Sequence, residues 1–408
     1  MRDWTEFGLR DVPAMSARTK VRHVPGRTSV IDPYLADVEG LLARPLVGIT
    51  TDGRPPEQRL RRPTGVPTDA IREAATAFLS LLEPDVRAKL TFPLRASEWR
   101  MWCNVHMNFY RHGVMLEDLP MSHREAFLRL LEVTLSARGY RQARDIMRLN
   151  ELLSEVSGSP DEFGEWPYFV SFFGAPSDSE PWGFQYEGHH LSVNVVVIGD
   201  ELVTTPLFMG SEPCAVREGR FAGISVMGDE QRSGLTLMRS LDPVQQATAL
   251  QYASIMPDQI PRHLQHFIDG RMQAGAFKDN VVLPYCGVRA DGFSDRQRRL
   301  LRDTIATYVG WTNEPHAAVK MRDVDATLDE TWFSWMGGTG PEDPFYYRVH
   351  SPVVLIEFDH HPGVVFDNKE PSHHHVHSII RTPNGGDYGH DLLGDHLDEF
   401  DHHDGRHH

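Results

Sequence analysis

The chain has 408 residues and a formal net charge of −16, and its 40% hydrophobic and 24% charged residues exclude a wholly disordered protein. The acidic balance argues against a nucleic-acid partner, because phosphate backbones are bound mainly by Lys and Arg. No apolar run approaches the roughly 18 residues of a spanning helix, and the first residues lack a signal-peptide pattern, so we expect a cytoplasmic protein without a membrane partner.

The N-terminal third of the chain is expected to be an irregular arm followed by helices. Residues 1–65 are rich in Pro, Gly and Arg and show little periodicity, which predicts an irregular N-terminal arm. From residue 66 to about residue 157 apolar residues recur at helical spacing. The two clearest stripes are Ile71, Ala74, Ala75, Phe78, Leu79 and Leu82, and Phe127, Leu128, Leu131 and Leu135.

Strands and helices then come in blocks. Between residues 166 and 226 the apolar period falls to two, which is typical of antiparallel strands. Helical patterning returns over 231–272 and again after Ser294, and strands return over 345–361 and 373–382. Blocks of this kind predict an α+β fold with a helical N-terminal layer packed on a largely antiparallel β-sheet. We predict a single large domain over residues 66–396 and a flexible His/Asp-rich tail over residues 397–408.

Two residue types bear on the chemistry. The three cysteines are odd in number and widely spaced, which indicates free thiols instead of disulfides or a Cys-based zinc site. The chain has 22 histidines, and more than half of them follow residue 358. Imidazole is a common ligand of iron, copper and zinc, so histidine is the candidate metal ligand.

His375 and His377 lie two residues apart in an apolar segment that is predicted to be a strand. Side chains at i and i+2 leave the same face of a strand about 6.6 Å apart at the backbone. Two imidazoles at this spacing can converge on one ion about 2 Å from each. The pair therefore predicts two ligands of one metal ion. The alternative is that the spacing arose by chance in a His-rich tract.

A second pair, His189 and His190, follows a glycine in another predicted strand. Adjacent strand residues point to opposite faces. On a regular strand His190 therefore shares a face with Asn194, and His189 shares the other with Glu187 and Gln185. One imidazole is then a ligand while the other orients it or contacts substrate. The alternative is a buried, hydrogen-bonded histidine beside a solvated one.

Charged residues accompany the H-x-H strand. Glu357 and Asp359 close an apolar run, and a buried carboxylate needs a cation, a donor or a metal. Either is then an oxygen ligand or the partner of a ligating histidine, unless this end is a surface turn. Arg381 falls on the face of His375 and His377, about 13 Å along the strand from His377. Its guanidinium predicts a bidentate contact to a substrate carboxylate or phosphate, and a salt bridge to one of the many acids is the alternative.

Several of these segments resemble the bacterial family catalogued as a domain of unknown function, number 3500, from roughly residue 65 to 396. The helical stretches around Trp102 and Asn104 and from Arg124 to Tyr140 are also similar to it. The matching positions are Trp182, Gln185, Gly188, His189, His190, Asn194, Glu357, Asp359, His375, His377 and Arg381. The family implies no settled activity, but it implies that the G-H-H and H-x-H-S motifs belong to one site. His360 and His361 depart from its pattern, as substrate-facing specialisation or as drift.

The sequence therefore predicts a mononuclear metal-dependent enzyme, an oxidoreductase acting on a small carboxylate-bearing metabolite. The cofactor is one divalent transition metal, iron, copper or zinc, and its predicted ligands are His190, His375 and His377, with Glu357 as a fourth ligand or an orienting group. The catalytic candidates are His189, Glu187 and Asp359, and the substrate-binding candidates are Arg381, Gln185, Asn194 and Trp182. One alternative is a zinc-dependent hydrolase at the same ligands, with His189 or Glu187 as general base. Another is a non-enzymatic metal-binding protein that uses the His-rich end.

Overall fold

The computed structural model describes residues 4–10, 31–56, 62–106, 109–110, 112–266 and 268–393. The α-helices are α1 (Ile31–Leu42), α2 (Asp69–Leu81), α3 (Pro84–Leu90), α4 (Met121–Thr134), α5 (Ala137–Ser157), α6 (Gly228–Ser240), α7 (Pro243–Ala249), α8 (Asp295–Val309) and α9 (Glu314–Ala326). The strands of the first half are β1 (Thr91–Phe92), β2 (Val114–Met115), β3 (Phe169–Phe173), β4 (Trp182–Gly188), β5 (Leu191–Ile198), β6 (Glu201–Val203) and β7 (Leu207–Ser211). Those of the second half are β8 (Leu250–Tyr252), β9 (Val288–Arg289), β10 (Trp332–Gly337), β11 (Phe345–His350), β12 (Leu355–His361) and β13 (Ser372–Arg381).

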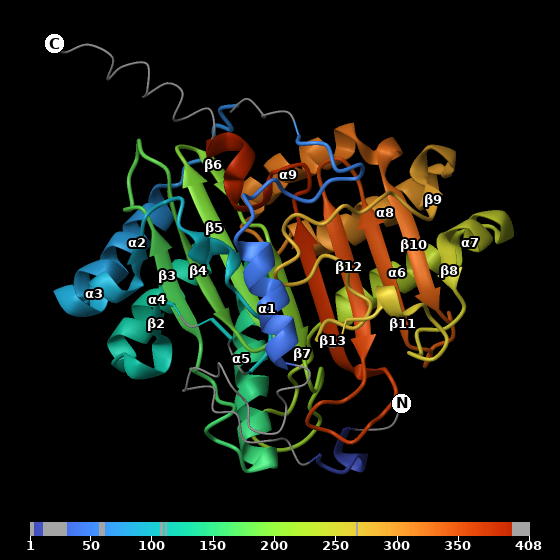
Figure 1. Cartoon of the computed structure of the whole chain (residues 1–408), viewed down its shortest axis with the longest axis horizontal. Helices are drawn as coiled ribbons and strands as arrows, with labels where there is room; N and C mark the ends of the chain where they lie inside the picture. The colour runs from blue at the N-terminus through green and yellow to red at the C-terminus, as the bar shows by residue number, and fades with distance from the viewer. Residues whose placement is uncertain are drawn as a thin grey trace.

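One large sheet forms the centre of the molecule (Figure 1). Its strand order is β1-β3-β4-β5-β7-β13-β12-β11-β10-β8, with β2, β6 and β9 paired beside this path. The pairing of β7 with β13 is antiparallel and joins the two halves of the chain. As a result the G-H-H segment and the H-x-H strand, far apart in sequence, lie close together near the middle of the sheet.

The expected α+β class is confirmed, but the expectation of a largely antiparallel sheet is corrected, because the sheet is mixed. The edge strand β1 pairs in parallel with β3, and β8 pairs in parallel with β10. In both cases helices separate the partners in sequence, α4 and α5 in one and α8 and α9 in the other. A crossover through helices returns the chain in the original direction, which gives a parallel pair.

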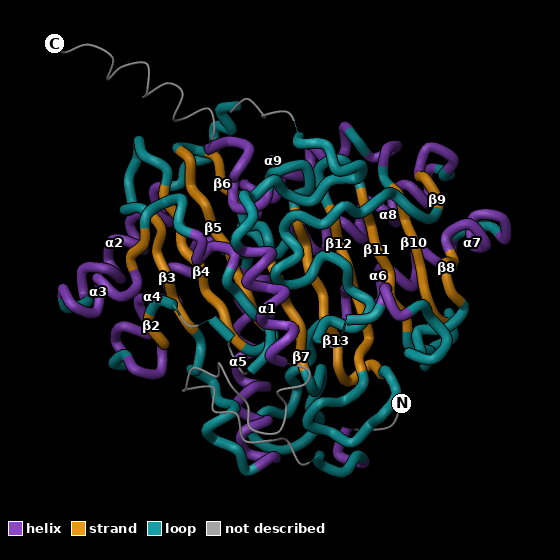
Figure 2. Tube along the Cα trace, in the orientation of Figure 1, coloured by secondary structure: helices purple, strands orange, loops and turns teal. Residues whose placement is uncertain are grey.

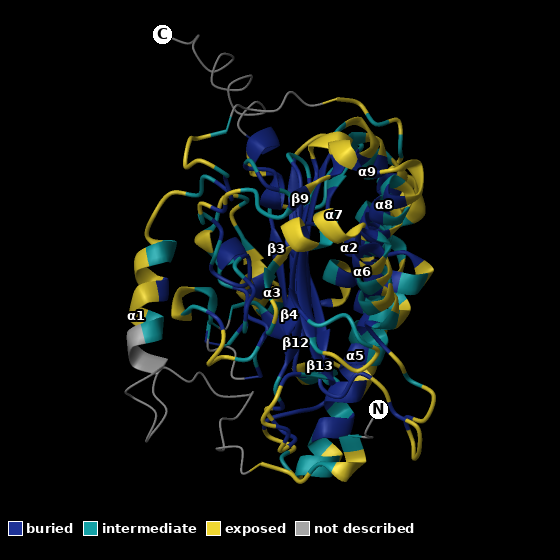
Figure 3. Ribbon diagram, turned by 90° about the vertical axis from the view of Figure 1, so that its right-hand side faces the viewer, coloured by how far each residue is buried: buried dark blue, intermediate teal, exposed yellow. Residues whose placement is uncertain are grey.

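The helical layer lies on one face of the sheet. In Figure 3, which views the sheet edge-on, α5, α6, α8 and α9 lie on one side and α1 on the other. The sequence predicts an N-terminal helical layer, but helices from both halves of the chain form it. Helices α2 to α5 lie beside the strands of the first half, and α6 to α9 lie beside those of the second (Figure 1). The helix-side core includes the apolar strand residues Phe172, Phe184, Val195, Leu207, Phe358 and Ile380, packed with helix residues such as Phe78, Phe127 and Ile305.

The opposite face of the sheet is covered mainly by irregular segments instead of helices (Figure 2). A separate core forms there from strand residues such as Phe208 and Ile379, loop residues such as Trp102 and Met272, and Tyr388 of a short 3-10 helix. Strand register places most of the predicted site residues on this loop-covered face, including Asp359 opposite His377 and His377 opposite Gly210. These polar side chains are buried, so each needs a hydrogen-bond or charge partner.

Both ends of the chain contain residues outside the described ranges. The predicted irregular arm includes a regular helix, α1, over Ile31–Leu42. The predicted tail over residues 397–408 lies outside the described residues, and the domain boundaries stay predictions. Within the described ranges, no helix combines the length and the hydropathy needed to cross a membrane.

Candidate metal centre

Three buried histidines converge at the junction of the two halves of the sheet. His190, His375 and His377 each offer one ring nitrogen, and these nitrogens all lie within 4.8 Å of one another. The Nε2 atom of His375 is 3.1 Å from Nε2 of His190 and 3.1 Å from Nε2 of His377. Two nitrogens that each lie about 2.0–2.1 Å from one ion are themselves separated by about 3 Å. The spacing therefore fits a shared cation.

His190 reaches this point from a turn, not from a strand. It is the second residue of the two-residue turn between β4 and β5, and its φ of 61° lies in the left-handed region. The regular-strand interpretation of this motif is therefore corrected. A non-glycine residue held in this region costs on the order of 1 kcal/mol and persists only where its surroundings impose it.

Backbone hydrogen bonds hold that turn in place. The N–H of His190 donates to the carbonyl of Asn104 at 2.9 Å, and the N–H of Gly210 donates to the carbonyl of His190 at 2.8 Å. The hydroxyl of Tyr168 donates to the carbonyl of His189 at 3.0 Å. The turn is thus anchored on three sides, which explains how its strained residue is kept in one orientation.

The other two ligands come from β13, as the H-x-H spacing predicts. The backbone carbonyl of Pro362 lies 2.7 Å from Nδ1 of His375. A carbonyl only accepts, so Nδ1 carries the proton and Nε2 presents its lone pair to the cluster. Opposite His377 in the sheet stands Gly210, where an added Cβ would meet the carbonyl oxygen of Val376 at 2.6 Å and Cδ2 of His377 at 3.3 Å. A larger residue would displace the ligand ring.

Burial keeps the cluster in its ligand form. Desolvation, reinforced by the neighbouring histidines, lowers the pKa of His190 and of His377 well below the usual range. Metal binding requires a neutral imidazole. These side chains are therefore poised to bind a cation near neutral pH.

A fourth histidine, His361, lies beside the cluster. Its ring centroid is 3.9 Å from that of His377 and 5.1 Å from that of His375. Its Nε2 lies 3.1 Å from Oδ2 of Asp359, without the alignment of a hydrogen bond. Residues 357, 359 and 361 alternate along β12, and this spacing is the signal in the sequence that points to His361.

Glu357 and Asp359 do not join the ion site. The carboxylate of Glu357 accepts hydrogen bonds from the N–H groups of Gln273 and Ala274 and from the hydroxyl of Tyr346, at 2.6 to 3.0 Å. Its predicted role as a fourth ligand is therefore corrected: backbone amides of a covering loop, not a metal, satisfy it.

Asp359 is held by Arg271. Nε of Arg271 donates to both carboxylate oxygens at 2.9 and 3.1 Å, and its backbone N–H donates to Oδ2 at 2.8 Å. Burial raises the pKa of Asp359, and the guanidinium opposes that shift. This carboxylate holds Arg271 and lies beside His361.

His189 and Glu187 lie behind the ligands. The His189 ring stacks on the His190 ring with centroids 3.9 Å apart, and its Nδ1 is 2.7 Å from Oδ1 of Asn150. Oε2 of Glu187 accepts from the N–H of Cys103 at 2.7 Å, and burial raises the pKa of Glu187 well above its usual range. These contacts place His189 against His190 and Glu187 against the segment that contains Cys103, and their expected catalytic roles stay predictions.

The side chains of the four predicted substrate-binding residues all form ion pairs or hydrogen bonds within the protein. Arg381 is fully buried; its Nη1 lies 2.9 Å from carboxylate oxygens of Asp279 and Asp387. Its Nε and Nη2 donate at 2.7 Å to the carbonyls of Ala274 and Gly275. These contacts leave no free edge for a substrate, so the structure favours the salt-bridge alternative.

The amide and indole groups are used in the same way. Gln185 donates to the carbonyl of Trp99 at 2.9 Å and to Oδ1 of Asn194 at 2.6 Å, and Asn194 donates to the carbonyl of Pro206 at 2.7 Å. Nε1 of Trp182 donates to the carbonyl of Ser177 at 3.1 Å. These contacts brace the hairpin that carries His190, and the expected substrate-binding role of these residues stays a prediction.

Supporting residues were missed because they come from segments without periodicity. Oδ1 of Asp269 lies 3.8 Å from Nδ1 of His377 and accepts from Nδ2 of Asn104 at 3.0 Å. Oε2 of Glu212 lies 3.9 Å from Nδ1 of His375. A carboxylate behind a ligating imidazole is the usual outer partner in metal sites. The only sequence signal was the W-x-N stretch that contains Asn104.

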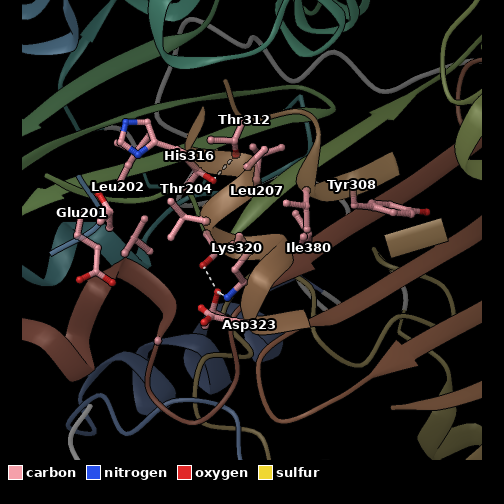
Figure 4. Close-up of a pocket in the computed structure, with 18 residues that line it drawn as sticks. Glu201, Leu202, Thr204, Leu207, Tyr308, Thr312, His316, Lys320, Asp323 and Ile380 are labelled. Atoms are coloured by element: carbon pink, nitrogen blue, oxygen red, sulfur yellow. Dashed lines mark hydrogen bonds between the residues drawn. The ribbon is translucent and has the colours of Figure 1, made fainter. Parts of the chain in front are cut away.

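Two cavities differ in their relation to the cluster. The larger, of about 740 Å³, is called the α1 cavity below; its lining includes Tyr34, Arg262, His266, Arg271, Lys278 and His361. The smaller, of about 70 Å³, lies near the C-terminal end of β13, between β6, β7 and α9 (Figure 4). There Thr204 bonds Thr312, and Lys320 donates to Thr382 at 3.1 Å. Only the α1 cavity contains a residue that touches the histidine cluster.

Comparison with known proteins adds a family and no activity. Residues 64–390 match the family described as "Protein of unknown function (DUF3500)". The match covers most of the chain, so the chain belongs to this family, and the resemblance seen in its motifs is confirmed. No curated protein and no solved structure gives a significant match.

Proposed function

We propose that this member of the family is a mononuclear metal-dependent enzyme, an oxidoreductase acting on a small carboxylate-bearing metabolite. The observation that carries the proposal is the buried convergence of His190, His375 and His377. Neutral imidazoles suit iron, copper or zinc. Three protein ligands leave at least one coordination position for substrate or water, which distinguishes a catalytic site from a closed structural one.

The surroundings of the cluster also favour a cation. Oδ2 of Asp269 is buried and has no hydrogen-bond partner among the described residues, and burial raises the pKa of this carboxyl to about 7. A buried carboxylate without compensation is costly. Positive charge bound to the far side of the His377 ring would supply that compensation, so the ion and the ionised carboxylate stabilise each other.

A zinc-dependent hydrolase is the second candidate, and one observation favours it. His361 lies beside the ligands, with its Nε2 3.1 Å from Asp359. An imidazole beside a metal centre is suited to accept a proton from water, and zinc lowers the pKa of a bound water. His361 thus replaces Glu187 and His189 as the base to be tested for this alternative.

Elemental analysis of the purified full-length chain tests the centre. A background variant in which His402, His403, His407 and His408 are changed to Ser removes metal scavenging by the tail. We expect about one ion per chain in this background, and loss of most of it in H377A. The matched control is H316A, because His316 is an equally buried histidine on α9. Full metal content in H377A would contradict the proposed centre. Loss of the metal in the tail variant itself would favour a non-enzymatic metal-binding protein that uses the His-rich end.

The reaction class needs a separate assay. Oxygen uptake by the iron- or copper-loaded chain, on addition of small 2-oxo or 2-hydroxy acids, is the expected result for an oxidoreductase, and H377A should abolish it. Ester or amide hydrolysis by the zinc-loaded chain, lost in H361A and without any oxygen uptake, would favour the hydrolase instead.

A further inference from the structure

His361 connects the α1 cavity to the metal ligands. Its side chain contributes to the cavity lining, and its ring packs against the rings of His377 and His375. A molecule in the cavity therefore lies one side chain away from the cluster. The volume of about 740 Å³ falls in the range of small-molecule sites, roughly 300–1,000 Å³.

One wall of the cavity is aromatic. The Tyr34 ring of α1 contacts the His266 ring at a centroid distance of 5.4 Å and the Phe277 ring at 6.3 Å, both edge-on. These side chains come from α1 and from the loop that covers the sheet, so the cavity lies between two separately anchored segments. Aromatic walls with a few polar groups are typical of ligand pockets.

The polar lining of the cavity is mainly basic. Arg262, Arg271 and Lys278 contribute to it, against the single carboxylate of Asp37. Arg271 is committed to Asp359. Among the described residues, neither Arg262 nor Lys278 has an ion-pair partner, although the whole chain carries a net charge of −16. Two uncommitted cations in an otherwise acidic protein favour an anionic occupant.

We infer that the α1 cavity is the substrate chamber of the metal centre, and that Lys278 and Arg262 bind a carboxylate of a small organic anion while its other end faces His361. The inference rests on the proposed function for the chemistry at the ion. The recognition of the anion depends on the two cations alone and takes over the part that Arg381 was expected to play.

Calorimetric titration of the full-length chain with succinate tests this assignment, with neutral succinamide as the matched probe. Both the metal-loaded and the metal-free chain are measured, so that a failed metal centre and a failed anion site give different results. We expect succinate binding to weaken about tenfold in K278M and in R262M, and to weaken further as ionic strength rises. The control is K89M, because Lys89 lies on α3 with only an exposed contact to Asp85.

Each outcome decides the inference. Succinate binding that depends on Lys278 and Arg262 in both forms supports the anion site, even if the metal content contradicts the centre. Succinate that does not bind the wild-type chain at millimolar concentration, or that binds K278M and R262M as tightly as K89M, would overturn it. Equal binding of succinamide would overturn it as well, because the two cations would then play no part.

Discussion

Replacing Arg381 with Met should destabilise the fold strongly instead of merely weakening substrate binding. The guanidinium is fully buried between Asp279 and Asp387 and donates to two backbone carbonyls. Without it Asp279 keeps Arg100 and Tyr388 as partners, whereas Asp387 keeps the N–H of Thr382. Breaking a buried pair by removing one partner costs about 3–5 kcal/mol, so we expect a loss of about that size, against a total stability of roughly 5–15 kcal/mol.

Urea denaturation of the R381M variant measures this loss directly. The matched control is R302M, because Arg302 forms an exposed pair with Asp325 at 2.6 Å, and such pairs contribute about 1 kcal/mol or less. A R381M variant whose unfolding free energy falls by less than that of R302M would refute the structural role. If its affinity for small carboxylates fell at the same time, the original prediction of a substrate-binding arginine would be restored.

Three further changes test two supports of the centre and one buried histidine outside it. D269N removes the charge behind His377 and should weaken metal binding about 10-fold or more, as measured by chelator competition; unchanged affinity would mean that this carboxylate does not support the ligand. G270A places a Cβ 2.4 Å from Oδ2 of Asp359 at a φ of +58° and should cost more than about 1 kcal/mol. G219A, at a φ of +81° with open space around it, should cost less in the same urea melts, and the reverse order would contradict the reasoning. Burial lowers the pKa of His350 to about 3, so its contribution to stability is present above the unfolded pKa of about 6.5 and is lost as pH falls toward 3. Between pH 7 and pH 5 the unfolding free energy of H350L should therefore fall by about 2 kcal/mol less than that of the wild type. An equal fall in both proteins would contradict this.

Periodicity predicted the parts of the molecule that are regular. The α+β class, the apolar stripes of the helices and the H-x-H strand all follow from local spacing. Ser294 and Gln297 form a capping box at the start of α8. The similar Ser122-Glu125 pattern does not cap its helix, because α4 begins at Met121, with Pro120 as its N-cap. A short motif alone does not fix a helix end.

The contacts that position the candidate site come from segments without a periodic pattern. His190 lies in a turn whose geometry is imposed by Asn104 and Gly210, and no spacing within the motif reveals those contacts. Glu357 was predicted as a ligand because a buried carboxylate needs a partner, but that partner is the backbone of residues 273 and 274. The loop that contains Asp269 and Arg271 supplies the outer contacts of the centre. The sequence therefore identified the three clustered histidines better than the residues that surround them.

X-ray absorption spectroscopy of the metal-loaded chain, in the background without tail histidines, tests the central claim most directly. A centre formed by His190, His375 and His377 predicts three imidazole nitrogens at about 2.0–2.1 Å from the ion. In H377A the number of imidazole nitrogens should fall, or the metal signal should disappear. A first shell of sulfur, or of oxygen without imidazole scattering, would contradict the account.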